Sequence, residues 1–130
     1  MTEFGKINSN GSESVYLQII RRFKLLILQG KYADGMEAPS RRMLAARLGV
    51  NPNTVQKAFA ELEREGLIIT PPNAKSIIRV NDAVVSRLRI ELIENEIASV
   101  ISAAKNAGMD YKQLTDLISL VWEKNNSVQV

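Results

Sequence analysis

The 130-residue sequence contains no cysteine and no histidine. The chain therefore forms no disulfide bond and lacks the usual ligands of zinc, haem and iron–sulfur clusters. A cysteine nucleophile and a Ser-His-Asp triad are excluded for the same reason. The carboxylates Glu91, Glu94 and Glu96 are accompanied by no glycine-rich phosphate loop, and we interpret them as the exposed face of a helix. The sequence thus predicts a protein that is not an enzyme and that needs no cofactor or metal.

Long apolar stretches are also missing. No run of about 18 apolar residues occurs, so the sequence predicts no membrane-spanning helix. Segment 1–14 is polar and rich in glycine, serine and asparagine, and it lacks the apolar centre of a signal peptide. We therefore expect a cytoplasmic protein with no membrane partner.

The net charge of +3 is small, but it is unevenly distributed along the chain. Residues 1–80 contain 12 Lys and Arg against 7 Asp and Glu, whereas residues 81–130 contain 5 against 7. The first part therefore carries +5 and the second part −2. This asymmetry favours a polyanionic partner for the first part alone.

Two helices are predicted in the first 50 residues. Apolar residues recur every three or four positions in segment 15–29, which predicts a helix with one buried face that ends at Gly30. Ser40 is a good N-cap for a short second helix, and Gly49 is placed to end it.

A third helix is marked more clearly than the others. Asn51 is a candidate N-cap, and Pro52 suits the first helical position, where its missing N–H costs nothing. Gly66 closes this helix. Because only residues 49–51 separate it from the previous helix, the two predict a helix-turn-helix.

After Gly66 the pattern changes to short β-branched runs. Residues 67–70 and 75–80 predict two strands, and the proline-containing segment 71–74 predicts the turn between them. Three helices followed by a hairpin predict a winged helix-turn-helix domain over residues 14–80, preceded by a flexible N-terminal segment at 1–13.

Two further helices are predicted in residues 81–130, which gives a fold that is mainly α with a small β-hairpin. Asp82 is the expected N-cap of a helix over residues 83–107, and Asp110 to Gln113 has the form of a capping box that opens a last helix. The long helix has more apolar positions than one short helix covers, so we favour self-association over packing on its own domain alone. We therefore predict a homodimer that forms through Leu88, Leu92, Ile93, Ile97, Val100, Ile101, Leu117, Val121 and Trp122.

The start of the third predicted helix carries the candidate base contacts. In a helix-turn-helix the first residues of the second helix face the base edges of the major groove. The polar side chains there suit adenine, thymine, guanine or phosphate groups, and they belong to Asn53, Thr54, Gln56 and Lys57. We interpret Asn51 as a cap rather than as a base contact.

The preceding helix and the hairpin carry the candidate phosphate contacts. Arg41 and Arg42 follow the cap of a helix that crosses the DNA backbone in this motif, and we favour phosphate binding over simple solvation for both. For Lys75 and Arg79 both interpretations stay open.

Four stretches of the chain, in this order, resemble the DNA-binding domain of the GntR family: YLQI at 16–19, APSRRMLA at 38–45, LGVNPNTV at 48–55 and LEREGLI at 62–68. The VNPNTV form, with only about 50 residues after the hairpin, is similar to the YtrA-like subfamily. The resemblance implies a homodimeric regulator, usually a repressor, that binds a palindromic operator and controls transporter genes. It implies DNA contacts at Arg42, Asn53, Thr54 and Gln56, and it identifies no effector.

The hairpin turn departs from that family. The family's turn has an Arg or His followed by two glycines around a variable residue, whereas this chain has Pro72, Asn73, Ala74 and Lys75. Glycines allow positive φ and a close approach to the minor groove, whereas prolines stiffen the turn. We therefore expect no insertion into the minor groove. A second interpretation also stays open, in which a winged-helix module has lost specific DNA binding and binds proteins instead.

Overall fold

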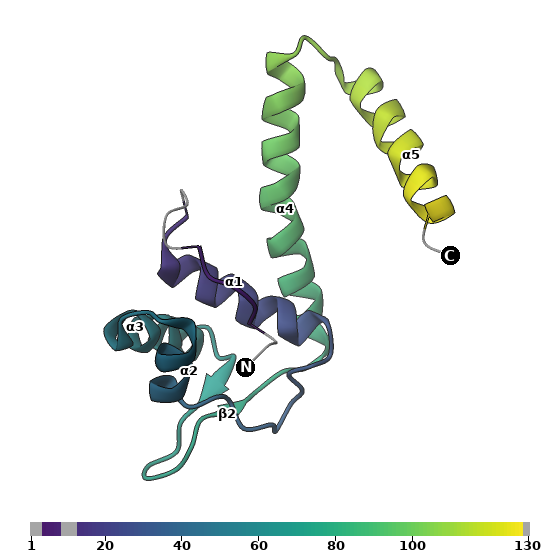
Figure 1. The fold of residues 1–130 in the computed structure, drawn as a ribbon. Coiled ribbons are helices and arrows are strands. Elements are labelled where there is room, and N and C mark those ends of the chain that lie inside the picture. The colour runs from purple at the N-terminus through teal and green to yellow at the C-terminus, as the bar shows by residue number, and fades with distance from the viewer. Residues whose placement is uncertain (1–3, 9–12, 129–130) are drawn as a thin grey trace. The chain divides into compact units, whose positions relative to one another are not determined.

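The computed structural model describes residues 4–8 and 13–128 (Figure 1). These residues form two compact units, which divide between Leu92 and Ile93. The first unit contains α1 (Val15–Leu28), α2 (Arg41–Leu48), α3 (Pro52–Arg64), β1 (Ile68–Ile69), β2 (Ile77–Ile78) and the start of α4 (Asp82–Asn106). The second unit contains the rest of α4 and α5 (Tyr111–Val128). The predicted fold class, a winged helix-turn-helix followed by two C-terminal helices, is confirmed. No helix in the described ranges is long and apolar enough to cross a membrane.

The boundaries of α2 and α3 lie where their capping residues predict them. The Ser40 hydroxyl accepts a hydrogen bond from the backbone N–H of Met43 at 3.3 Å. Gly49 ends α2 with a φ of 68°, a left-handed conformation that glycine adopts without steric cost. The Asn51 side chain accepts from the N–H of Asn53 at 2.8 Å, so Asn51 is the N-cap of α3. The turn between the two helices therefore consists of residues 49–51.

The start of α4 differs from the prediction by one residue. Asn81, not Asp82, is the cap, because the Asn81 side chain accepts a hydrogen bond from the N–H of Val84 at 2.9 Å. The predicted capping box of α5 is confirmed. The Asp110 carboxylate accepts from the Gln113 N–H at 2.8 Å, and the Gln113 side chain accepts from the Asp110 N–H at 2.9 Å.

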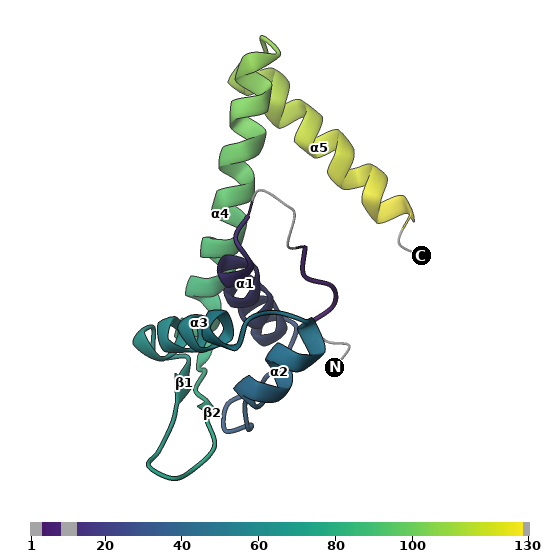
Figure 2. The ribbon, with the colours of Figure 1, turned by 60° about the vertical axis from the view of Figure 1, so that its left-hand side comes forward.

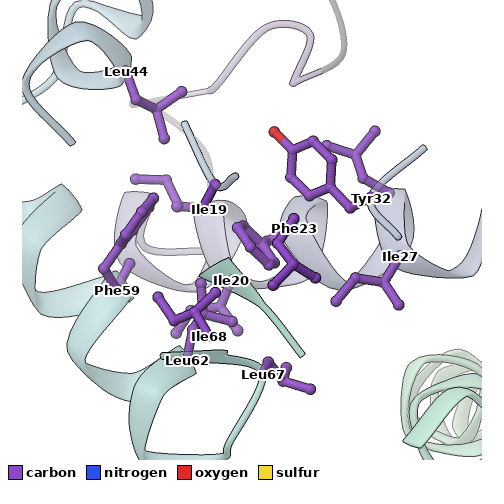
Figure 3. Close-up of a cluster of buried hydrophobic side chains, with 14 of the residues drawn as sticks. Ile19, Ile20, Phe23, Ile27, Tyr32, Leu44, Phe59, Leu62, Leu67 and Ile68 are labelled. Atoms are coloured by element: carbon purple, nitrogen blue, oxygen red, sulfur yellow. The ribbon is translucent and has the colours of Figure 1, made fainter. Parts of the chain in front are cut away.

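Helices α1, α2 and α3 lie together with the hairpin in the first unit (Figure 2), and a core of buried side chains joins these elements (Figure 3). Phe23 of α1 lies at its centre, with its ring centroid 6.0 Å from that of Phe59 on α3 and 5.0 Å from that of Tyr32. Both ring pairs have the edge-to-face geometry that aromatic side chains favour. Other buried members are Ile19, Ile20, Leu26, Leu44, Val55, Ala58, Leu62, Leu67, Ile68 and Ile78.

The N-terminal segment does not behave as predicted where the structure describes it. Phe4 is fully buried in the same core, with its ring centroid 6.5 Å from that of Phe23. Arg22 donates to the backbone carbonyl of Phe4 at 2.9 Å, and Asn8 and Gln18 exchange hydrogen bonds at 2.9 and 2.7 Å. The prediction of a flexible segment at 1–13 is therefore wrong for residues 4–8, which pack on α1. Residues 1–3 and 9–12 lie outside the described residues.

The hairpin forms with shorter strands than predicted. Ile68 pairs with Ile78 and Ile69 pairs with Ile77, in antiparallel register. Residues 71–74 form a turn closed by the N–H of Ala74 and the carbonyl of Pro71 at 3.2 Å. On its other side β2 bonds to the segment after α1, since the N–H of Ile78 donates to the carbonyl of Met36 at 2.8 Å. The hairpin is thus held from both sides within the first unit.

Helix α4 has two apolar faces, which the sequence pattern does not distinguish. Leu88 is fully buried in the core of the first unit, where Val84 and Val85 pack beside it. Ile90, two residues later, lies about 200° further round the helix and is 66% exposed. Leu88 therefore belongs to the core of the first unit and is not available for dimerisation.

Candidate nucleic-acid interface

The N-terminal half of α3 presents most of the predicted base-contact residues on its outer side, and Thr54 among them is half-buried. Val55, Ala58 and Phe59 are fully buried, which fixes the orientation of the helix on the core. Asn53 and Gln56 are exposed, and their side chains make no hydrogen bond to the described part of the chain. These two amide side chains on α3 are thus free to bind a partner.

Lys57 is also exposed, but its side chain has a defined neighbour. Its ammonium nitrogen lies 5.1 Å from the ring centroid of Tyr16, on α1. This cation–π contact restricts the directions that the lysine samples while leaving its charge in place. The motif at 16–19 includes Tyr16, but the sequence does not indicate this contact, because a contact between α1 and α3 has no local signal.

The two neighbouring arginines at the start of α2 have different environments. Arg42 is exposed and forms no ion pair or hydrogen bond with the described residues. Arg41 is partly buried, pairs with Glu63 of α3 at 2.8 Å, and stacks over Phe59 with its guanidinium carbon 5.0 Å from the ring centroid. Arg42 therefore faces outward, as a phosphate contact requires, whereas Arg41 is committed to contacts within the unit.

The hairpin turn carries one predicted contact, Lys75. Its ammonium nitrogen lies 3.4 Å from the Glu37 carboxylate, and both side chains are more than half exposed. Arg79, at the base of the hairpin, lies 3.8 Å from Asp34. Exposed pairs of this kind contribute little to stability and exchange readily for another anion. Lys75 thus lies at the surface of the hairpin, which is the wing of this domain, and Glu37 neutralises its charge only weakly.

Carboxylates neutralise much of the positive charge of the first unit, but not all of it. Each of the six acidic residues at 13–80 pairs with a Lys or Arg, and these acids are Glu13, Asp34, Glu37, Glu61, Glu63 and Glu65. On α2 and α3, the cations with no carboxylate partner among the described residues are Arg42, Arg47 and Lys57. Three cations without a carboxylate partner therefore lie on the two helices of the helix-turn-helix.

Lys24 is a buried cation whose contacts are all within the protein, so it does not face DNA. Its ammonium group lies 2.6 Å from Glu91 of α4 and 3.0 Å from Glu65, the C-cap of α3. Burial by itself lowers the pKa of Lys24, but hydrogen bonds to Glu91 and Glu65 outweigh this effect, and the pKa is raised above its ordinary value. The three side chains therefore join α1, α3 and α4 within the first unit.

The predicted dimerisation residues of the second unit are apolar and exposed. Their exposed fractions range from 39% at Ile101 to 67% at Trp122, and the others are Ile93, Ile97, Val100, Leu117 and Val121. Leu92 is half-buried and belongs to the first unit. Apolar surfaces of this kind mark sites where proteins associate.

Comparison with known proteins decides the family. The sequence model of the family 'Bacterial regulatory proteins, gntR family' matches residues 15–74. The transcriptional repressor YtrA of Bacillus subtilis is 35% identical over 114 residues, which cover 87% of this chain and 88% of YtrA. This chain belongs to the GntR family of DNA-binding transcription regulators. The resemblance that the sequence motifs indicated is thus confirmed, as is the prediction that the chain is not an enzyme.

Solved structures of GntR regulators share the fold along most of the chain. A regulator from Listeria monocytogenes superposes with a TM-score of 0.74 at 26% identity, over 85% of this chain and 96% of that one. YtrA of Sulfolobus acidocaldarius, a GntR-family transcription factor, has a TM-score of 0.55 at 31% identity, over 72% of this chain and 96% of its own. The similarity therefore includes residues beyond the winged helix-turn-helix.

Proposed function

We propose that this GntR-family protein is a homodimeric repressor that binds a palindromic operator in double-stranded DNA. The observation that carries the proposal is the outer face of α3, where Asn53 and Gln56 are exposed without internal partners. Unpaired cations on α2 and α3 flank this face, so base contacts and phosphate contacts lie together. The name of the B. subtilis relative, a transcriptional repressor, supports repression as the outcome.

The side chains divide into two roles. Asn53 and Gln56 read bases, because the amide group of either residue matches the two hydrogen-bonding positions of adenine in the major groove. Thr54 binds a phosphate oxygen or a thymine methyl group. Arg42 and Lys57 bind phosphates and set the register of the protein on the duplex. Lys75 adds a phosphate contact from the wing after it leaves Glu37.

Dimerisation is part of this mechanism. The exposed apolar side chains on α4 and α5 in the second unit need a cover, and a second copy supplies an identical surface. Two copies related by a two-fold axis present two recognition helices to major grooves roughly 34 Å apart. We therefore expect each half-site alone to bind weakly.

The proposed targets and location rest on the resemblance to this family. We propose transporter genes as the targets, since the subfamily that the sequence resembles controls such genes. A DNA-binding regulator acts where the DNA is, and for this reason we keep the cytoplasm as the expected location.

Selection from a random library of double-stranded DNA tests the proposal. The protein is incubated with random 30-base-pair duplexes, bound DNA is recovered and sequenced, and the enriched sequence is measured in gel shifts against excess random duplex. We expect an enriched palindrome bound with at least about 10³-fold preference. The logarithm of the affinity should fall with the logarithm of salt concentration with a slope of about −5 to −7, from three or four phosphate contacts per protomer.

Two outcomes contradict the proposal. Enrichment of no sequence, with binding equal to that of random DNA, would support the protein-interaction module instead. Enrichment of a single half-site that binds as tightly as the palindrome would rule out the dimeric mechanism. Sedimentation of the same samples gives the oligomeric state independently of DNA.

A further inference from the structure

We propose that Arg41 positions the wing of the domain instead of binding a DNA phosphate. It does so through Glu63 and the hydroxyls of Thr70 and Ser76, which fasten both ends of the wing turn to α3. Only the last step of this inference, the effect on operator affinity, rests on the proposed DNA-binding function.

The Arg41 side chain is held in place by three contacts within the first unit. Its Nη2 atom lies 2.8 Å from the Glu63 carboxylate and 3.5 Å from the hydroxyl oxygen of Thr70. Its guanidinium carbon lies over the ring of Phe59. The Nε atom is buried and has no hydrogen-bond partner in the described ranges. A guanidinium with one edge buried and one nitrogen on Glu63 has no complete fork left for a phosphate.

The contacts continue from Glu63 into the wing. The Thr70 hydroxyl lies 2.6 Å from the same Glu63 oxygen and can only donate to it, because a carboxylate accepts. The Thr70 proton is then used, so the Ser76 hydroxyl, 2.6 Å away, donates to Thr70. Thr70 follows β1 and Ser76 precedes β2, so the chain of hydrogen bonds closes the wing turn at both ends.

Ser76 also ties the wing to the segment before α2. Its side chain is buried, and its backbone carbonyl accepts from the N–H of Ala38 at 2.9 Å. Lys75, the neighbour of Ser76, lines a groove together with Ser40 and Arg41. The position of Lys75 relative to α2 is therefore set by the same contacts that Arg41 and Glu63 anchor.

Glu63→Gln separates the two roles of Arg41, because they predict opposite effects. The substitution removes a negative charge and releases Arg41 from its ion pair. If Arg41 binds DNA, the released arginine strengthens binding to the selected operator. If Arg41 positions the wing, binding weakens by about three- to tenfold although the protein has become more positive.

Glu61→Gln is the matched control. Glu61 lies on the same helix and forms an ion pair with Arg64, so this variant also loses one negative charge and frees one arginine. Its carboxylate makes no contact with Thr70 or Ser76. Operator affinity measured by fluorescence anisotropy should fall for Glu63→Gln relative to Glu61→Gln. Equal or tighter binding by Glu63→Gln would overturn the proposal.

A second variant and a DNA-free measurement cover the remaining outcomes. Thr70→Val keeps the shape of the side chain and the Arg41–Glu63 pair but breaks the link to Ser76. In backbone NMR of the free protein, Asn73, Ala74 and Lys75 should become more mobile in Thr70→Val and in Glu63→Gln, but not in Glu61→Gln. Unchanged mobility of the turn contradicts the wing anchor even if the wild-type protein binds no preferred DNA sequence, so a failure of the proposed function stays distinguishable.

Discussion

Replacement of Phe4 by alanine tests whether the N-terminal segment is part of the folded domain. The sequence favours a flexible tail there, because segment 1–14 is polar and lacks a recognisable helix or strand. In the structure Phe4 is fully buried, and its ring lies 6.5 Å from Phe23 and 6.3 Å from Tyr32 between centroids. We therefore expect Phe4→Ala to destabilise the protein as a core substitution does.

The magnitude follows from the burial and from the position in the chain. Burial of a phenylalanine side chain stabilises by about 1.5–3 kcal/mol, and an aromatic pair adds about 0.5–1.5 kcal/mol. Residues 4–8 belong to no helix or strand and can detach together, so the loss cannot exceed the free energy that holds this segment on α1. We expect a loss of about 2–3 kcal/mol, below the about 3–5 kcal/mol of an internal Phe→Ala substitution.

Equilibrium urea unfolding followed by far-ultraviolet circular dichroism measures the loss. Leu17→Ala is the control, because Leu17 is an apolar residue of α1 that is 49% exposed, and it should cost less than about 1 kcal/mol. A chain without residues 1–8 sets the upper limit and should lose about as much as Phe4→Ala. A loss for Phe4→Ala no larger than that of Leu17→Ala would refute the docking of the segment.

Three further predictions concern bases, association and pH. Gln56→Ala should change the DNA sequence that the selection enriches and weaken binding to the original operator by about 1–3 kcal/mol. Arg42→Ala should weaken binding to all sequences alike. An equal loss of sequence preference in both variants would contradict the assigned roles. Ile97→Glu should shift the protein to monomers in sedimentation. Leu88→Ala should instead lower the free energy of unfolding by about 2–5 kcal/mol and leave the dimer intact. Dissociation of the dimer by Leu88→Ala, without an effect of Ile97→Glu, would contradict this assignment. Because the pKa of Lys24 is raised on folding, its stabilising effect is complete below the ordinary value of 10.5 and is lost as the pH rises through the folded value. Urea unfolding should therefore show a decline above about pH 10.5 that Lys24→Met reduces, and equal declines in both proteins would count against the buried pair.

Most of the helix boundaries could be predicted because local residues determine them. Ser40, Asn51 and Asp110 each accept a hydrogen bond from a backbone N–H two or three positions later, which the sequence spacing already shows. Asn81 and Asp82 are the exception. Both residue types are good N-caps and they are adjacent, so only the observed hydrogen bond to Val84 distinguishes them.

Contacts between distant segments could not be predicted in the same way. Burial of Phe4 depends on the space that Phe23 and Tyr32 leave at the end of the core, and no periodicity in residues 4–8 reports it. The sequence alone does not separate the two apolar faces of α4. A spacing of three or four residues between apolar positions indicates that a helix has an apolar face, but not which part of the protein covers it. Leu88 was assigned to the wrong face for this reason.

The arginines at 41 and 42 show why net charge alone does not locate a DNA contact. Adjacent residues on a helix point about 100° apart, so one of the two faces α3 and the other faces solvent. Arg41 faces α3 and forms an ion pair with Glu63, which neutralises its charge within the first unit. Because every acidic residue described at 13–80 has such a partner, the surplus charge of the first part appears where no carboxylate reaches, and on α2 and α3 these positions are Arg42, Arg47 and Lys57. The pattern of ion pairs, and not the number of basic residues, therefore determines which side chains are available to a phosphate.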